Sequence, residues 1–253
     1  MMDAVASWPV AYILSGVIWS VVLGFAAGNY ACSLVHRLPR GKLMLDKTPY
    51  CGNCGTLLQV KDLFPVISAL LLRHKCRYCG QPFPTSHTWT EVLIGLLFIL
   101  GFLQHGFGEQ YILIVLIGTF LVTLAAIEIN ENIMMGKILL CVIVFGMMYR
   151  ILQDASIYPA CFGGLYGMML GAIIGRKNIK KVGHIYVLPP LALLLAAGGV
   201  CVGEKGLLTF FALFAAFYIL AKILGGMNKP VRLTVPFGFA VILPVLYPNL
   251  VSL

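Results

Sequence analysis

The chain has 253 residues, of which 60% are apolar and 11% are charged, and its mean hydropathy is +0.94. This composition excludes an ordinary water-soluble globule, a disordered chain and a small disulfide scaffold. Lys and Arg number 18 against 9 Asp and Glu, but these cations are scattered over polar breaks and form no single basic domain. The composition therefore predicts a lipid bilayer, and no nucleic acid, as the partner of this chain.

Eight apolar runs are candidates for membrane-spanning helices. A bilayer core about 30 Å thick requires roughly 20 apolar residues per helix, and backbone groups in lipid must pair within their own helix. The expected spans are Pro9–Val35, Glu91–Leu103, Tyr111–Ile129, Ile133–Leu152, Pro159–Gly175, Ile185–Val202, Leu207–Leu224 and Thr234–Val251. The pattern predicts an all-α membrane protein with eight transmembrane helices.

The distribution of cations predicts the orientation, because Lys and Arg beside membrane spans remain on the cytoplasmic side. With the N-terminus outside, sixteen of these residues lie inside and only Arg150 and Lys205 lie outside. The N-terminal apolar run lacks a basic leader and a clear cleavage site, so we expect it to be retained as the first helix.

One long polar interval separates the first two spans and predicts three domains. Residues 1–36 form the first transmembrane helix, residues 37–90 form a cytoplasmic domain, and residues 91–253 form a bundle of seven transmembrane helices. The other loops are short, so functional groups elsewhere are expected at helix ends or inside the bundle.

The cytoplasmic interval contains two Cys-x-x-Cys pairs, Cys51-Gly-Asn-Cys54 and Cys76-Arg-Tyr-Cys79, with 21 residues between them. Two thiolates on a tight turn can reach one ion, and two such knuckles complete a tetrahedral shell that suits Zn²⁺. The alternatives are unrelated pairs or disulfides, and a cytoplasmic location disfavours disulfides. Cys51, Cys54, Cys76 and Cys79 are therefore the expected ligands of a structural zinc ion in a small zinc-knuckle domain.

Two backbone patterns predict how the bundle is packed. Gly163, Gly167, Gly171 and Gly175 recur every four residues and form one stripe along which a neighbouring helix can approach closely. Pro189-Pro190 removes backbone donors near the start of the sixth span and is expected to kink it.

Ionisable groups at membrane depth are costly and are frequently functional. Glu128 and Glu131 end the third span, where a spacing of three puts them on one helix face. His184 opens the sixth span on the same side of the membrane, and Glu91 stands at the entrance of the second span. The alternative is that these are interfacial residues whose charged ends reach water.

An ordered set of motifs resembles the type IV prepilin leader peptidases, which are polytopic membrane proteins of bacteria. The motifs are Gly28-Asn29-Tyr30, His36-Arg37-Leu38-Pro39, the two Cys-x-x-Cys pairs with Asp62, Pro65-Val66 and Ser68 between them, Glu91, and Val235-Pro236-Phe237-Gly238. The resemblance implies a place in the bacterial inner membrane, in a type IV pilus or type II secretion system. It also implies binding of the N-terminal helix of pilin-like precursors.

Members of that family cleave a basic leader with two aspartates and methylate the new N-terminus with S-adenosylmethionine. In this chain the aspartate positions align with Glu128, in Ala125-Ala126-Ile127-Glu128, and with His184, in Lys181-Val182-Gly183-His184. Both aspartates are therefore replaced. Cleavage of this kind needs two carboxylates that share a proton, one as base and one as acid. A Glu and His couple favours an ion pair instead.

The resemblance leaves several functional hypotheses. The first is a degenerate relative, a pseudoenzyme that binds or assists pilin-like precursors without aspartyl cleavage. The second is an active leader peptidase that uses Glu128 and His184, with Glu131 as a further acid. A related alternative is that these three side chains bind a divalent cation. The third is a methyltransferase-only relative with S-adenosylmethionine as cofactor, and a channel or transporter is a weaker fourth.

Overall fold

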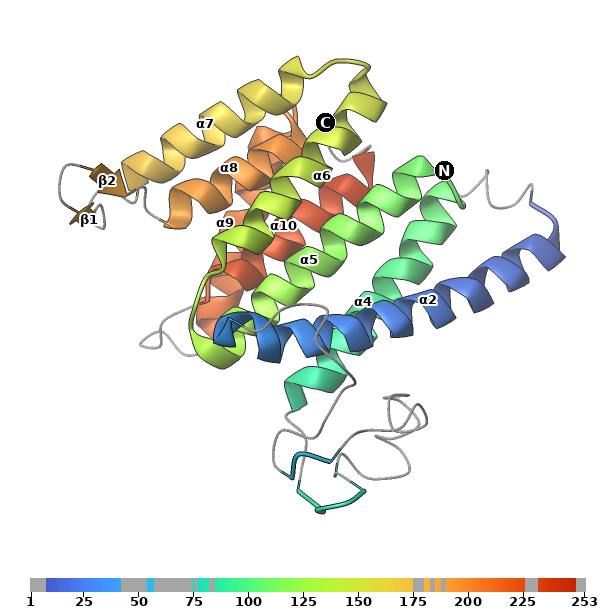
Figure 1. The fold of residues 1–253 in the computed structure, drawn as a ribbon. Helices are drawn as coiled ribbons and strands as arrows, with labels where there is room; N and C mark the ends of the chain where they lie inside the picture. The colour runs from blue at the N-terminus through green and yellow to red at the C-terminus, as the bar shows by residue number, and fades with distance from the viewer. Residues whose placement is uncertain are drawn as a thin grey trace.

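In the part of the chain that the computed structural model describes, the regular structure is helical apart from one short hairpin (Figure 1). The described residues are 8–41, 54–56, 75, 77–81, 85–174, 180–182, 185–187, 190–225 and 232–248. The described elements are α2 (Val10–Arg37), the 3₁₀ turn η1 (Leu38–Arg40), α4 (Thr85–His105), α5 (Glu109–Glu131), α6 (Gly136–Asp154), α7 (Tyr158–Ile174), β1 (Lys180–Val182), β2 (Ile185–Val187), α8 (Pro190–Val202), α9 (Leu207–Gly225) and α10 (Thr234–Leu246). Within these ranges there are eight α-helices, so the predicted all-α class is confirmed.

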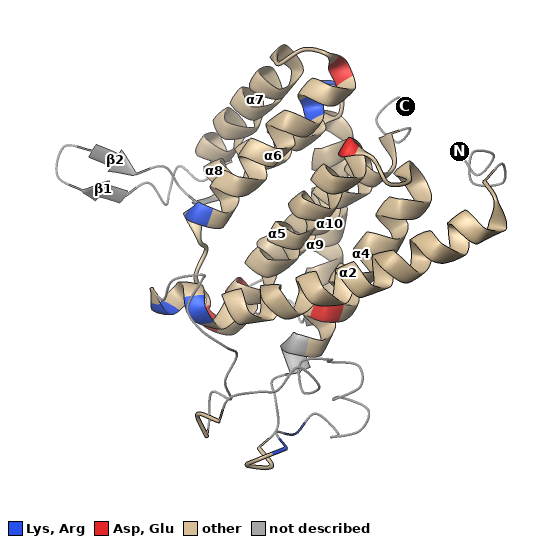
Figure 2. Ribbon diagram, turned by 45° about the vertical axis from the view of Figure 1, so that its right-hand side comes forward, with Lys and Arg blue, Asp and Glu red and all other residues tan. Residues whose placement is uncertain are grey.

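The helices are apolar enough for the chain to be a multi-pass membrane protein. Five are long enough to cross a bilayer, namely α2, α4, α5, α6 and α9, and α7, α8 and α10 are shorter apolar helices. In Figure 2 the ribbon segments of the described Lys, Arg, Asp and Glu residues lie near the ends of the helices. This distribution agrees with an apolar solvent around the middle of the bundle.

Two of the expected spans are shorter than predicted. The sixth was expected to begin at Ile185, but Ile185–Val187 is a strand that pairs antiparallel with Lys180–Val182, and α8 begins only at Pro190. A residue that precedes a proline is disfavoured in the helical conformation, whereas proline fits the first turn of a helix. The proline pair therefore marks the start of the helix and does not kink its interior.

The last helix stops at Leu246, although the apolar run was expected to remain helical to Val251. Tyr247 has φ −121° and ψ 76°, outside the helical region. The residue after it is Pro248, and a proline pushes the preceding residue towards extended conformations. Local sterics therefore end the helix within an apolar run.

The helices pack in three groups along the bundle (Figure 1). Helix α2 lies against α4 on one flank, α5, α6 and α10 form the centre with α9 against α10, and α7 packs along α8 on the other flank. The main core contains large side chains of the central helices, such as Leu121, Tyr149 and Phe237, which are 1% exposed or less.

The predicted glycine stripe is confirmed along the described part of α7. A Cβ atom on Gly163 would lie 2.2 Å from the Gly199 carbonyl oxygen, and one on Gly167 would lie 2.2 Å from that of Leu195. A Cβ on Gly171 would also meet the α8 backbone, 2.5 Å from the Cα of Ala192. Helix α8 therefore lies in direct backbone contact with the stripe. Gly175 lies outside the described residues.

Candidate functional site

Glu128, in the last turn of α5, reaches across to the first residues of α10. Its Oε1 accepts a hydrogen bond from the Leu233 N–H at 3.3 Å, and its Oε2 accepts one from the Thr234 N–H at 2.9 Å. The Thr234 hydroxyl donates a further bond to Oε2. One carboxylate therefore accepts three hydrogen bonds from the start of another helix.

This contact satisfies donors that α10 cannot satisfy by itself. The first N–H groups of a helix have no partner within the helix, and the N-cap residue, Leu233, has no polar side chain to accept from them. Thr234 is 1% exposed, so water is excluded from its side chain. A carboxylate at a helix N-terminus also interacts favourably with the helix dipole. Glu128 thus caps α10 from α5.

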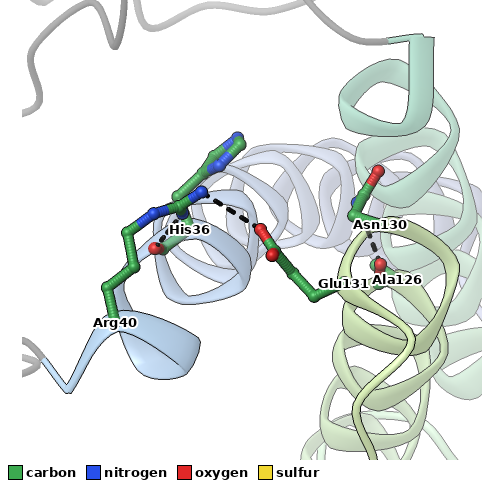
Figure 3. A network of polar contacts seen from close by, with 5 residues as sticks. All are labelled: His36, Arg40, Ala126, Asn130 and Glu131. Atoms are coloured by element: carbon green, nitrogen blue, oxygen red, sulfur yellow. Dashed lines mark hydrogen bonds and ion pairs between the residues drawn. The ribbon is translucent and has the colours of Figure 1, made fainter.

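Glu131, one turn further along α5, binds a different element. The Nη2 of Arg40 lies 3.1 Å from its Oε1, which forms an ion pair between η1 and α5. The Nη1 of Arg40 donates to the His36 carbonyl oxygen at 2.6 Å. Figure 3 shows the Arg40 guanidinium between the two acceptors, with Asn130 bonded back to Ala126 in its own helix.

The two glutamates lie at the same end of α5, as predicted, and the helix continues through both. Their carboxylates are nevertheless engaged separately, one by the backbone of α10 and one by Arg40. Glu131 is also partly exposed to solvent, with 30% of its side-chain surface accessible. The structure therefore gives each carboxylate its own partner and shows no contact that joins them.

His184, the other expected site residue, lies outside the described residues, between β1 and β2. Strand β2 begins at Ile185, so this position does not open the sixth helix as expected. Its relation to Glu128 is untested, and the Glu128 and His184 pair stays a prediction.

The cysteine knuckles are described only in part. Cys54 and Cys79 are exposed, whereas Cys51 and Cys76 lie outside the described residues. The glycine after each described cysteine has a left-handed backbone, with φ +70° at Gly55 and +69° at Gly80. The two turns therefore share one local geometry. In the described part of the chain no group of three His, Cys, Asp or Glu side chains is placed to hold a metal ion.

Glu91, the acidic landmark of α4, is buried against α2. It is 5% exposed, and a Cβ on Gly28 would lie 3.0 Å from its Cα. The helices can approach this closely because Gly28 has no side chain. Two motifs that stand 63 positions apart in the sequence therefore meet at one contact.

The α10 side of the Glu128 contact was missed by sequence reasoning. Thr234 was identified only as the first residue of the last span. A threonine at the start of a predicted helix is a recognisable N-terminal signal, but the identity of the distant acceptor depends on how α5 and α10 pack.

Comparisons with known proteins find similarity in the region that contains Gly28, the cysteine pairs and Glu91. Residues 22–105 match the family model "Bacterial Peptidase A24 N-terminal domain". This match covers the end of α2, the cysteine-containing interval and α4. The apolar helices and this match together define a multi-pass helical membrane protein whose N-terminal region is similar to the A24 domain.

Similarity to individual proteins extends beyond residues 22–105. The chain is 26% identical to a "Prepilin leader peptidase/N-methyltransferase" of Myxococcus xanthus over 65% of this chain and 47% of that protein. It is 24% identical to the protein of the same name in Bacillus subtilis, over 87% of this chain and 88% of that protein. No solved structure gives a significant match. In its N-terminal region the chain is similar to the bacterial A24 peptidases, and over more of its length it is similar to prepilin leader peptidase/N-methyltransferases.

The match to the Myxococcus protein covers about half of the length of that relative. The names of the relatives therefore describe the activity of those proteins.

Proposed function

We propose that this chain is a degenerate prepilin peptidase of the bacterial inner membrane, which binds or assists pilin-like precursors without aspartyl cleavage. The N-terminus lies outside and the cysteine-containing domain lies in the cytoplasm. The partner is the apolar N-terminal helix of a pilin-like precursor, the substrate class that the family implies.

The engagement of Glu128 carries this proposal. A general base needs a lone pair directed at the water that it activates, and a carboxylate has about four lone-pair positions. Three hydrogen bonds from the start of α10 occupy this carboxylate. A residue that holds two helices together in this way is retained for structure even where cleavage is lost.

The residue types at the aligned positions support the same conclusion. Two carboxylates that share one proton can act as acid and base in turn, but glutamate and histidine attract each other as an ion pair. Glutamate is also longer than aspartate by one methylene, and a displacement of about 1 Å can reduce a rate about a hundredfold.

The decisive experiment expresses the full chain in membranes together with pilin-like precursors, and measures both cleavage and co-purification. We expect stable co-purification without cleavage. Cleavage that is lost in both Glu128→Gln and His184→Ala would instead establish an active peptidase that uses those two residues. The matched control is Glu131→Gln, which removes a charge from the same end of the same helix but leaves α10 capped.

The methyltransferase-only alternative is tested separately by calorimetry with S-adenosylmethionine. The degenerate binder is expected to give no heat of binding. A saturable heat together with methylation of a precleaved pilin-like peptide would replace the proposal with the methyltransferase function.

A structural Zn²⁺ held by Cys51, Cys54, Cys76 and Cys79 belongs to this proposal. Four thiolates form a closed tetrahedral shell that holds the surrounding fold and leaves no open coordination position. The left-handed glycines after the two described cysteines support a pair of equivalent knuckles.

Metal analysis of the purified chain tests the zinc site. We expect one zinc per chain, lost in Cys51→Ser and retained in Cys161→Ser, which alters an exposed cysteine of α7. Equal zinc contents in the two variants would contradict this ligand set. The experiment also separates the site from a cation bound by Glu128, Glu131 and His184, because such a cation would remain in the Cys51 variant.

The orientation is tested with a membrane-impermeant amine reagent. Lys205 and Lys137 are both exposed at opposite ends of the bundle. Modification of Lys205 from outside the inner membrane, with Lys137 protected, is the expected result. The reverse pattern would invert the topology.

A further inference from the structure

A cavity of about 190 Å³ lies at the opposite end of the bundle from Glu128. It is formed where α6, α8 and α10 end. Its lining includes Arg150, Gln153, Asp154, Lys205 and Val245. It is larger than a single buried water requires.

The cavity is rich in hydrogen-bond donors. Arg150 is 7% exposed, and its Nη2 lies 2.6 Å from Asp154 Oδ2 while its Nη1 donates to Gln153 Oε1 at 3.2 Å. Its Nε is buried and has no hydrogen-bond partner among the described residues. A buried donor without a partner is costly and needs an explanation.

Lys205 adds a second cation to the same lining. No hydrogen bond or ion pair involves its ammonium group within the described ranges. Two cations therefore face one carboxylate, and that carboxylate is already bound by Arg150. The cavity has an excess of positive charge and of N–H donors.

Neutralisation of helix ends does not account for the two cations. Cations are favourable at the C-terminal ends of helices, where the last carbonyls lack partners. Arg150, however, donates to two side chains and not to such carbonyls, and in the described part of the chain Lys205 donates to none of them. By the predicted topology these are also the only two Lys or Arg residues on the outer side, where the positive-inside rule disfavours them.

The backbone at Gly203 leaves room for the Arg150 side chain. Gly203 has φ +74°, and a Cβ there would lie 2.5 Å from the Arg150 Nη2. Only a glycine at this position combines the left-handed conformation with room for the guanidinium. Arg150 is thereby held in the wall of the cavity.

We propose that this cavity, the Arg150–Lys205 pocket, binds a phosphate-type oxyanion. The ligand is either the headgroup of an anionic phospholipid or inorganic phosphate. Phosphoryl oxygens are acceptors only, and arginine and lysine are the side chains that bind them best. This proposal is independent of whether the chain cleaves pilin-like precursors.

The test uses the full chain, purified in detergent and stripped of lipid, and follows the midpoint of thermal unfolding. One arm titrates inorganic phosphate against chloride at matched ionic strength. The other titrates a short-chain phosphatidylglycerol against the corresponding diacylglycerol, which has no phosphate. A saturable rise of several degrees in either arm is expected, because a ligand that binds the native state stabilises it. The responding arm identifies the source of the phosphate.

Three variants make the test specific. Lys205→Gln alters an exposed residue and should weaken the apparent affinity about tenfold, the loss expected for one charge-assisted hydrogen bond. Gln153→Glu gives Arg150 a second carboxylate, which should preserve folding but abolish the response. Lys137→Gln removes one charge from the opposite end of α6 and should leave the response unchanged. A native chain that responds to neither probe, or equal responses in all three variants, would overturn the proposal.

Discussion

The two ends of the bundle each contain a charged side chain that is largely shielded from water, and the protein satisfies the two groups differently. At one end, three donors from the start of α10 converge on Glu128. At the other end, Arg150 has two acceptors and keeps a buried Nε without a partner in the described part of the chain. A charge whose hydrogen-bonding positions are filled by the protein can serve as a structural link. A charge that is left partly unsatisfied beside a cavity points to a ligand.

Removal of the Glu128 carboxylate should have the largest effect on stability. Glu128→Ala leaves two backbone N–H groups and the buried Thr234 hydroxyl without their acceptor, so we expect a loss of roughly 2–4 kcal/mol in the free energy of unfolding. Unfolding in a detergent titration measures this loss. A value no larger than that of Glu131→Ala would show that the cap on α10 contributes nothing beyond an ordinary charge, and the contrast between the two ends would disappear.

A methyl group at Gly203 tests how tightly the Arg150 guanidinium is held. Gly203→Ala should cost about 1–3 kcal/mol, because alanine is strained at φ +74° and its Cβ would crowd Arg150. The matched control is Gly41→Ala, since Gly41 has φ +66° with no atom within 4 Å of an added Cβ. The difference between the two variants isolates the crowding. Equal losses would show that Arg150 moves aside freely, which would weaken the case for a pre-arranged pocket.

The Thr234 hydroxyl is expected to contribute less than the carboxylate that accepts from it. Thr234→Val keeps the size of the side chain but removes one donor to Glu128, and should cost about 1 kcal/mol in the free energy of unfolding. Thr234→Ser retains the hydroxyl and should recover most of this loss apart from the missing methyl. If Thr234→Val left the stability unchanged while Thr234→Ser lowered it, packing of the methyl group would be the dominant contribution, and the hydroxyl would not belong to the cap.

Much of the helical plan was predictable because apolar length and composition determine membrane spans. The contact between α7 and α8 was also predictable, since glycines every four residues lie on one face of any helix and leave room for a neighbouring backbone. Such features are encoded within about one helix length of sequence. They can therefore be recognised without knowing which helices pack together.

The starts and ends of two helices were less predictable, because apolar composition does not distinguish a strand from a short helical turn. Ile185–Val187 is as apolar as the helix that follows it, yet it forms a strand before the proline pair. The prolines indicate these helix ends correctly, because Pro190 begins α8 and Pro248 follows the end of α10.

The site was predictable only in its residues and not in their partners. Glu128 was expected at the end of α5 and lies there, but its bond to Thr234 joins positions 106 apart in the sequence. Arg150 and Lys205 were recognised as the two cations expected outside, and nothing in their spacing showed that they line one cavity. Such contacts arise from packing between helices, which a single sequence does not display.

The smallest effect is expected at the Arg40 and Glu131 ion pair, which completes the comparison at the Glu128 end. Arg40 retains 52% of its side-chain surface exposed and Glu131 retains 30%, so water screens their attraction. Exposed pairs of this kind contribute about 0.2–1 kcal/mol, and salt reduces the contribution further. Glu131→Gln should therefore lower the free energy of unfolding by less than 1 kcal/mol at low salt and by less still at high ionic strength. A loss that is independent of salt and as large as that of Glu128→Ala would mean that the turn η1, and not α10, is the element that the end of α5 holds in place.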